Sequence, residues 1–297
     1  MLCILKTVIQ IFGTSFSGSS LLNQLLNSQN GIRGLGEVVH YYMPMGKDGC
    51  CVQCKEKVVE CPFFKDINPK KFYADCLAKY KCDVVVDSSK SIRMMEVLDP
   101  DLRYIRIFLS KTPHEYAYSC VQHSQEKNAI QWFAQYSVIY KNLMNSYKNH
   151  EAKYSGIYHA DTVKLCYRSL ALHPKKIIES LCSLCGVSFD SEAFSRWYTT
   201  DSHIIGGNLS LRAQNNQSEK FFQKDSKYKG KLNTIFLDQH WRNDEQFIDE
   251  CKRAYRIYGS EFDEILQHLG QPSVQELVQD LESGFVPQST LSTFIAA

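Results

Sequence analysis

Residues 8–26 read VIQIFGTSFSGSSLLNQLL, and this stretch carries the clearest structural signal in the chain. Its first part, Val8–Phe12, is a short β-branched and aromatic run that ends at Gly13, which predicts a buried strand. Leucines at positions 21, 22, 25 and 26 then follow with helical spacing, so Ser19–Asn27 is predicted to be a helix. A strand, a Gly/Ser turn and a helix in this order are typical of a phosphate-binding loop, where backbone amides and the helix N-terminus attract an anion.

The turn differs from the loop of nucleotide triphosphatases. In those enzymes a lysine after the last glycine reaches the outer phosphates, and the next Ser or Thr holds magnesium. Here Gly18 is followed by Ser19 and Ser20, and Phe16 stands where a cation is usual. The sequence therefore does not predict ATP hydrolysis or a required magnesium ion. A Gly/Ser turn that only caps a helix is the alternative for so short a motif.

Further apolar runs predict a central parallel β-sheet flanked by helices. The segments CDVVVDSSK (Cys82–Lys90) and RYIRIFLSK (Arg103–Lys111) are predicted strands that end in polar residues, and YSGIYHAD (Tyr154–Asp161) is predicted as a fourth strand. Pro113–His123 and Glu126–Tyr147 have helical character. Alternating strands and helices favour an α/β fold whose ligand lies outside the carboxyl ends of the strands.

Length and charge constrain the domain organisation and the partners. The chain has 297 residues, of which 44% are hydrophobic, and a formal net charge of +2. This composition favours one domain over residues 1–270 with a tail at 271–297, and the small net charge argues against a nucleic-acid or membrane-surface protein. Residues 48–66 are predicted to be a Cys-rich insertion, and the polar residues 199–235 a loop or lid.

The chain has twelve cysteines and no apolar run long enough to span a bilayer. Because its start reads as a first strand without a signal-peptide cleavage site, we expect a cytoplasmic protein with reduced thiols. The group Cys50, Cys51, Cys54 and Cys61 contains a C-x-x-C and could supply zinc ligands, but no second C-x-x-C follows closely. A structural role for these cysteines is favoured over zinc binding, and no metal site is predicted.

These motifs, together with others in the same order over about residues 8–260, resemble the P-loop sulfotransferases that use 3′-phosphoadenosine 5′-phosphosulfate. The similarity is greatest to a bacterial branch related to tyrosylprotein sulfotransferases. SFSGSSLL is similar to the 5′-phosphosulfate loop of the family, VVVDSSK to a strand end beside the sulfonyl group, and YIRIFLSKTPHEYAYSC to the 3′-phosphate motif. HIIGGNLSLR is similar to the loop that closes over the nucleotide.

The resemblance implies a P-loop NTPase-like sulfotransferase fold and a set of site residues. The implied cofactor-binding residues are Ser15, Phe16, Ser17, Gly18, Ser19 and Ser20 in the loop, Lys111 and Ser119 at the 3′-phosphate, Tyr158 near the adenine, and Asn208 and Arg212 in the closing loop. The implied catalytic residues are Glu37 as the base, Lys90 as the cation at the sulfonyl or bridging oxygen, and His203 as a second base or an acceptor contact.

The implied reaction moves a sulfuryl group from 3′-phosphoadenosine 5′-phosphosulfate to a hydroxyl or amine of a small-molecule or natural-product acceptor, with no metal required. The expected partner is that acceptor, without nucleic acid or membrane, and a homodimer is an option. Phe16 and the sequence SKTPH replace cations that the family usually carries. A module that binds the sulfonucleotide without catalysis is therefore one alternative, and a protein or carbohydrate sulfotransferase is another. A kinase-like phosphotransferase is disfavoured by the missing lysine.

Overall fold

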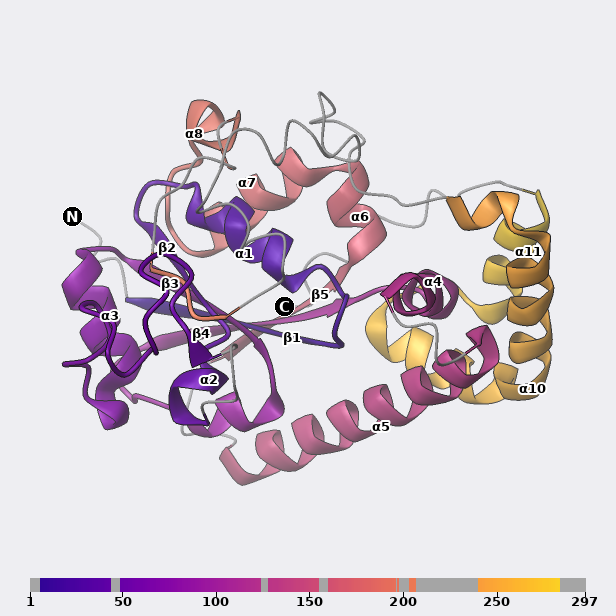
Figure 1. Cartoon of the computed structure of the whole chain (residues 1–297), viewed down its shortest axis with the longest axis horizontal. Helices are drawn as coiled ribbons and strands as arrows, with labels where there is room; N and C mark the ends of the chain where they lie inside the picture. The colour runs from indigo at the N-terminus through magenta and orange to yellow at the C-terminus, as the bar shows by residue number, and fades with distance from the viewer. Residues whose placement is uncertain are drawn as a thin grey trace.

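A computed structural model describes residues 6–43, 49–123, 128–154, 160–195, 197, 203–206 and 240–283 (Figure 1). Its centre is a parallel sheet of five strands in the order β2-β3-β1-β4-β5. The strands are β1 (Thr7–Gly13), β2 (Ile32–Gly36), β3 (Val84–Lys90), β4 (Arg103–Ser110) and β5 (Ala160–Cys166). Because the strands are parallel, their carboxyl ends meet at one edge, where α/β proteins bind ligands.

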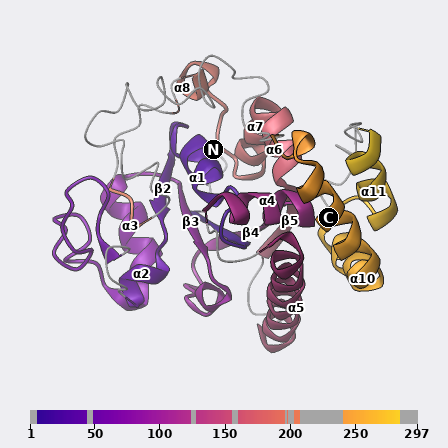
Figure 2. The same ribbon diagram turned by 45° about the vertical axis from the view of Figure 1, so that its right-hand side comes forward.

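Helices cover both faces of the sheet (Figures 1 and 2). Ile9 and Ile11 of β1 pack with α1 (Ser19–Asn27), α6 (Tyr167–Leu172), α7 (Pro174–Leu184) and α8 (Ser191–Ser195). Val8 and Phe12 point to the opposite face, which is covered by α3 (Phe72–Tyr80), α4 (Pro113–His123), α5 (Ala129–Tyr154) and α10 (Glu245–Leu269). Successive side chains of one strand therefore enter different cores, as expected for a sheet that is buried on both sides.

The remaining elements are short. They are α2 (Val39–Tyr42), α11 (Val274–Ser283) and the 3-10 helices Pro69–Lys71, Ile92–Glu96 and His240–Asn243. Among the described residues, none of the helices combines the length and the apolar character that a membrane span requires.

The α/β fold with its parallel sheet is confirmed, and several predicted elements match. The helices α1 and α4 cover the predicted residues, and β1, β3 and β4 lie where apolar runs predicted strands. Most of the strand predicted over 154–161 lies outside the described residues; at its ends, Tyr154 is the last residue of α5, whereas Ala160 and Asp161 are the first residues of β5. In β5, Val163 and Leu165 are buried in the core, whereas Asp161 is exposed and pairs with Arg103. This alternation marks a strand buried mainly on one face, and the polar residues within it masked the signal.

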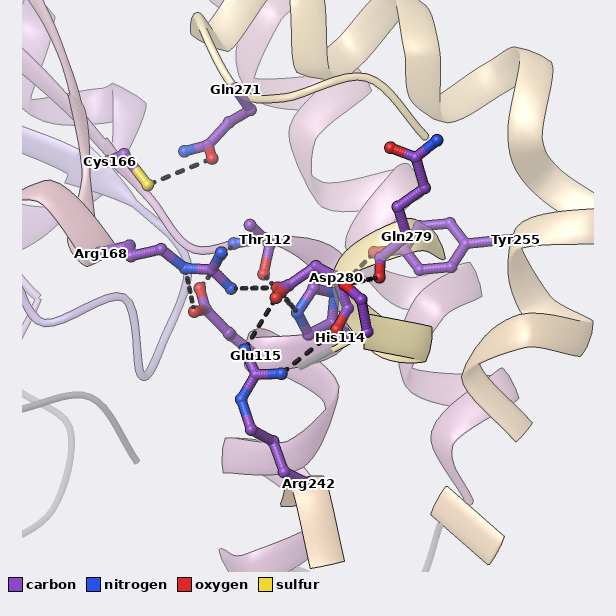
Figure 3. A network of polar contacts seen from close by, with 11 residues as sticks. Thr112, His114, Glu115, Cys166, Arg168, Arg242, Tyr255, Gln271, Gln279 and Asp280 are labelled. Carbon is purple, nitrogen blue, oxygen red and sulfur yellow. Dashed lines mark hydrogen bonds and ion pairs between the residues drawn. The ribbon is translucent and has the colours of Figure 1, made fainter. Parts of the chain in front are cut away.

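A buried network of charges joins α11, the last described helix, to α4 and α6 (Figure 3). Arg168, two residues after β5, donates from Nε to Glu115 Oε1 at 2.8 Å and from Nη2 to Asp280 Oδ2 at 2.8 Å. Arg242 donates to the other Asp280 carboxylate oxygen at 2.7 Å. The Asp280 side chain has no exposed surface. Two guanidinium groups therefore face two carboxylates, and all of these side chains except that of Arg242 are almost fully buried.

Burial and charge fix the protonation of the groups around this network. Burial would by itself raise the pKa of Glu115, but the charge of Arg168, the neighbouring His114 and hydrogen bonds together lower that pKa to about 2. Burial lowers the pKa of His114 to about 4, so its ring is neutral at pH 7 and adds no further positive charge. Neutral His114 completes the site through its Nδ1, which lies 2.9 Å from the Tyr255 hydroxyl.

Candidate functional site at the carboxyl ends of the strands

Each strand delivers a functional residue or segment to the same edge of the sheet. The Gly/Ser loop follows β1, Glu37 follows β2 and Lys90 is the last residue of β3. Lys111 follows β4, and Tyr167 follows β5. The central strand β1 lies between β3 and β4, so the loop lies where the strand order reverses, which is the usual ligand position in open α/β sheets.

The Gly/Ser loop leaves the N-terminus of α1 open. Gly18 is the N-cap residue with φ of 98°, and no side chain caps the helix. The Ser17 hydroxyl is buried and has no hydrogen-bond partner among the described residues. Phe16 also has a positive φ of 63°, and 38% of its surface is exposed. A helix N-terminus without a side-chain cap and an unpaired buried hydroxyl favour an anion at this turn.

Gly18 is required by its neighbour as well as by its backbone. A Cβ atom added to Gly18 would lie 2.4 Å from Cδ2 of the Tyr167 ring. The same ring lies under the Lys111 ammonium, whose Nζ is 4.5 Å from the ring centroid. Tyr167 therefore forms a wall that contacts the loop after β1 and carries the cation after β4. Sequence reasoning missed this residue, although an aromatic directly after a strand could have indicated it.

We predict that Gly18→Ala lowers the free energy of unfolding by about 2–5 kcal/mol, since a left-handed residue with a Cβ costs about 1–2 kcal/mol and overpacking against Tyr167 adds about 1–3 kcal/mol. Gly186→Ala is the matched control, because Gly186 has φ of 71° but nothing lies within 4 Å of an added Cβ. Urea denaturation should therefore show only the backbone cost at Gly186. Equal losses in the two variants would contradict a steric role for Tyr167.

Lys111 and Ser119 are brought together, as the 3′-phosphate motif implied. Lys111 Nζ donates to Ser119 Oγ at 2.9 Å. Ser119 lies in the second turn of helix α4. Ser119 Oγ donates in turn to the backbone oxygen of Glu115 at 2.9 Å. The Tyr136 hydroxyl holds the backbone oxygen of Lys111 at 2.9 Å. A cation and a hydroxyl thus share one small region, which suits a phosphate oxygen.

Glu37 and Lys90 also meet, although 53 residues separate them in sequence. Lys90 Nζ contacts Glu37 Oε1 directly, and His40 Nε2 lies 3.1 Å from the other carboxylate oxygen. Each of the two paired side chains is about one-sixth exposed, with 17% of its surface accessible. Lys90 has a positive φ of 62°, so two non-glycine residues with left-handed backbones, Phe16 and Lys90, lie at this edge. Strained residues of this kind gather at functional sites.

A buried carboxylate under Lys90 fixes the position of this pair. Asp87 Oδ1 accepts a hydrogen bond from the Ser89 hydroxyl, and Asp87 Oδ2 accepts one from Tyr73 at 2.6 Å. The Ser89 hydroxyl oxygen accepts from the amide of Val39 at 2.9 Å, two residues after Glu37. Burial raises the pKa of Asp87 above its ordinary value, while these donors oppose that change. The segment DSSK therefore anchors the start of α2 to the end of β3.

The other predicted site residues lie elsewhere or outside the described residues. Tyr158, Asn208 and Arg212 belong to the segments that the structure does not describe. His203 is described, but its Nδ1 is 3.3 Å from Cys51 Sγ and 3.3 Å from Cys61 Sγ. The histidine in contact with Glu37 is His40, three residues further along the chain and missed by sequence reasoning.

Comparison with known proteins agrees with this architecture. No protein-family model matches the sequence, and no curated protein does so either. Among solved structures, the sulfotransferase domain from the curacin biosynthetic pathway aligns with a TM-score of 0.53 and 18% identity, over 91% of this chain and 100% of that domain. The chain has the sulfotransferase fold.

Two other sulfotransferase structures align less well. The sulfotransferase domain from the Synechococcus PCC 7002 olefin synthase has a TM-score of 0.45 and 16% identity, over 83% of this chain and 94% of that domain. A sulfotransferase from Mycobacterium tuberculosis H37Rv has a TM-score of 0.39 and 14% identity, over 77% of each chain. At these similarities the curacin domain supports the sulfotransferase fold alone.

Proposed function

We propose that this protein transfers a sulfuryl group from 3′-phosphoadenosine 5′-phosphosulfate to a hydroxyl or amine of a small-molecule acceptor. The contact between Glu37 and Lys90 carries the proposal, because it places a carboxylate and an ammonium group together at the ends of β2 and β3. Lys90 also pairs in the sheet with Phe12, two residues before the loop begins. A carboxylate and an ammonium group therefore lie beside the Gly/Ser turn.

The nucleotide would lie along the ends of β1 and β4. The open N-terminus of α1 and the Ser17 hydroxyl suit the 5′-phosphosulfate, while Lys111 and Ser119 suit the 3′-phosphate. Tyr167 contacts both places and would set the distance between them. Phe16 carries no charge, so the positive charge at the sulfonyl group would come from Lys90.

In the proposed reaction the acceptor oxygen or nitrogen attacks sulfur and forms a new bond to it. The bond from sulfur to the bridging oxygen breaks, and its electron pair remains on the 5′-phosphate of 3′-phosphoadenosine 5′-phosphate. Glu37 accepts the acceptor proton, and Lys90 stabilises the charge that develops on the bridging oxygen. The acceptor would enter between these two side chains and replace their direct contact.

The nature of the acceptor is part of the proposal. The curacin domain that shares the fold belongs, by its name, to a biosynthetic pathway, which agrees with a natural-product acceptor. We also propose a cytoplasmic location and a relationship to the bacterial, tyrosylprotein-like branch, on the motifs of the sequence. A homodimer remains an option for the assembly.

Ligand binding provides a direct test of the nucleotide part. We expect 3′-phosphoadenosine 5′-phosphate, in buffer without magnesium, to stabilise the chain by about 2.7 kcal/mol at a concentration 100 times its dissociation constant. Lys111→Ala should weaken this binding by about 10- to 100-fold, because a charged hydrogen bond contributes about 1.5–3 kcal/mol. The affinity for adenosine 5′-monophosphate, which lacks the 3′-phosphate, should stay unchanged. Thermal-shift titration measures both quantities.

Lys141→Ala is the matched control for this experiment, because Lys141 is a half-exposed lysine that pairs with Glu261 on the helix surface. It should bind both nucleotides like the unmodified chain. Stabilisation by ATP with magnesium, combined with no response to 3′-phosphoadenosine 5′-phosphate, would overturn the proposed function. Equal weakening of both nucleotides by Lys111→Ala would show that Lys111 does not bind the 3′-phosphate.

A further inference from the structure

Four side chains with metal-binding atoms meet on the side of the sheet where β2 lies. They are Cys51, Cys54 and Cys61 from the Cys-rich insertion and His203 from a segment more than 140 residues away, and their ligand atoms all lie within 4.8 Å of one another. In a tetrahedral zinc site with Zn–S near 2.3 Å and Zn–N near 2.05 Å, a sulfur and a nitrogen are about 3.6 Å apart. The two measured distances from His203 Nδ1 to sulfur, both 3.3 Å, are close to that value.

Cys51 and Cys54, which supply two of the three sulfurs, lie on one tight turn that ends at Lys55. The Lys55 amide donates to the backbone oxygen of Cys51 at 3.0 Å, and Lys55 has a positive φ of 64°. The sulfurs of Cys51 and Cys54 lie within 4.8 Å of each other on this turn, a separation that one metal ion can bridge.

The third cysteine also lies on a tight turn. The Phe64 amide donates to the backbone oxygen of Cys61 at 2.9 Å. The Phe63 ring stacks on the His203 ring, with centroids 5.6 Å apart and planes 17° apart. The Tyr80 hydroxyl donates to the backbone oxygen of His203 at 2.9 Å. The His203 ring is thus positioned by Phe63 and its backbone by Tyr80, while its Nδ1 lies 3.3 Å from two sulfurs.

We propose that the protein binds one zinc ion through Cys51 Sγ, Cys54 Sγ, Cys61 Sγ and His203 Nδ1. Three neutral thiols would release three protons to solvent when Zn²⁺ binds, no electrons are transferred, and the completed site carries one negative charge. All four positions are filled by the protein, so the site is structural and keeps no open position for water or substrate. It departs from the expectation that the chain has no metal site, and it does not rest on the proposed sulfuryl transfer.

The metal has a clear structural task. Residues 203–206 lie between the insertion and β2, where the Val52 amide donates to Ile204 O at 2.8 Å and the Ile205 amide donates to Leu35 O at 2.8 Å. The Glu37 amide donates to Ile205 O at 2.7 Å. Zinc on His203 would therefore fasten the segment that pairs with the backbone of Glu37.

Metal content of the full chain tests the proposal. We expect the protein, produced with zinc in the medium and purified without chelator, to contain one zinc per chain by native and elemental mass spectrometry. Cys51→Ser and Cys61→Ser should each lose the metal, whereas Cys50→Ser should keep it. Cys50 is the matched control, because it is the neighbouring half-buried cysteine whose sulfur lies outside the ligand group.

Titration with Co²⁺ and the variant His203→Cys test whether His203 binds the metal or has only a packing role. Zinc-free chain titrated with Co²⁺ should gain the visible bands of a tetrahedral ion and a near-ultraviolet thiolate charge-transfer band. His203→Cys should keep one metal per chain and increase the charge-transfer intensity, because a fourth thiolate replaces the imidazole. His203→Ala should bind the metal more weakly. These readouts do not depend on serine variants that fail to fold.

Three results would overturn the proposal. The first is a purified chain without zinc that also takes up Co²⁺ without thiolate bands. The second is equal loss of metal in Cys50→Ser and Cys51→Ser. The third is a disulfide within the group: the denatured chain should react as twelve free thiols, the number in the sequence, and a count lower by two would indicate an oxidised pair instead.

Discussion

Glu37→Gln is expected to lower the rate of sulfuryl transfer by about 10²- to 10⁴-fold, the usual contribution of a general base. The substitution keeps the shape of the side chain but removes its ability to accept a proton from the acceptor. The affinity for 3′-phosphoadenosine 5′-phosphate should stay the same, because Glu37 follows β2 whereas the proposed nucleotide contacts follow β1 and β4. The rate is measured as transfer of radiolabelled sulfuryl to a panel of simple phenols, alcohols and amines.

Lys90→Met is the partner variant in a double-mutant cycle. Because Lys90 contacts Glu37 directly, the two substitutions together should cost less than the product of their separate effects, as in other sites where residues act as a unit. Glu261→Gln is the control glutamate, since it lies in a surface pair with Lys141. Glu37→Gln with nearly full turnover would exclude Glu37 as the base, and independent effects at the two positions would exclude a joint role.

Asp280→Asn is expected to lower the free energy of unfolding by about 3–5 kcal/mol, which is the cost of breaking a buried ion pair from one side. The substitution leaves Arg168, whose side chain is only 4% exposed, with Glu115 as its charged partner, and it removes the carboxylate charge that Arg242 contacts (Figure 3). Urea denaturation gives the free energy directly, and the melting temperature should fall by on the order of 10 °C.

The control for this prediction is again Glu261→Gln. The Lys141–Glu261 pair has 48% and 33% of its side-chain surface exposed, so its loss should cost less than about 1 kcal/mol. If Asp280→Asn cost no more than this surface variant, the network would contribute nothing beyond its packing. A large loss would instead show that α11 is an integral part of the fold, even though the sequence reads as a tail from residue 271.

The parts of the fold that the sequence predicts well are those where local pattern and tertiary burial agree. The leucines of Ser19–Asn27 lie on one helical face, and Val84–Val86 forms a continuous apolar run in a strand that is buried on both faces. β2 was not predicted, because IRGLG has two glycines in five residues and becomes a strand only by pairing with β3. Residues 162–166 of β5 were not predicted, since the polar residues of this strand alternate with the buried ones.

In the candidate site, too, a contact within one stretch of sequence was predicted and contacts between distant stretches were not. The resemblance to the 3′-phosphate motif implied Lys111 and Ser119 together, since both lie in one short stretch of sequence, and they are in contact in the structure. Lys90 beside Glu37 and the two sulfurs beside His203 come from distant parts of the chain, so no local pattern reveals these contacts. His203 was predicted as a second base from its place in a motif, but its position beside two sulfurs depends on how residues 203–206 pair with β2.

The pairing of residues 203–206 with β2 also bears on aggregation, because β2 is an edge strand. β2 is the outermost strand on its side of the sheet, and an exposed strand edge invites a strand from another molecule. Ile205 bonds to Leu35 and Glu37 and so occupies the backbone groups at the end of this strand. A chain in which residues 203–206 came loose would offer that edge for aggregation at the same place where it presents Glu37. The segment that bonds to the backbone of the candidate base therefore also covers the end of the outermost strand.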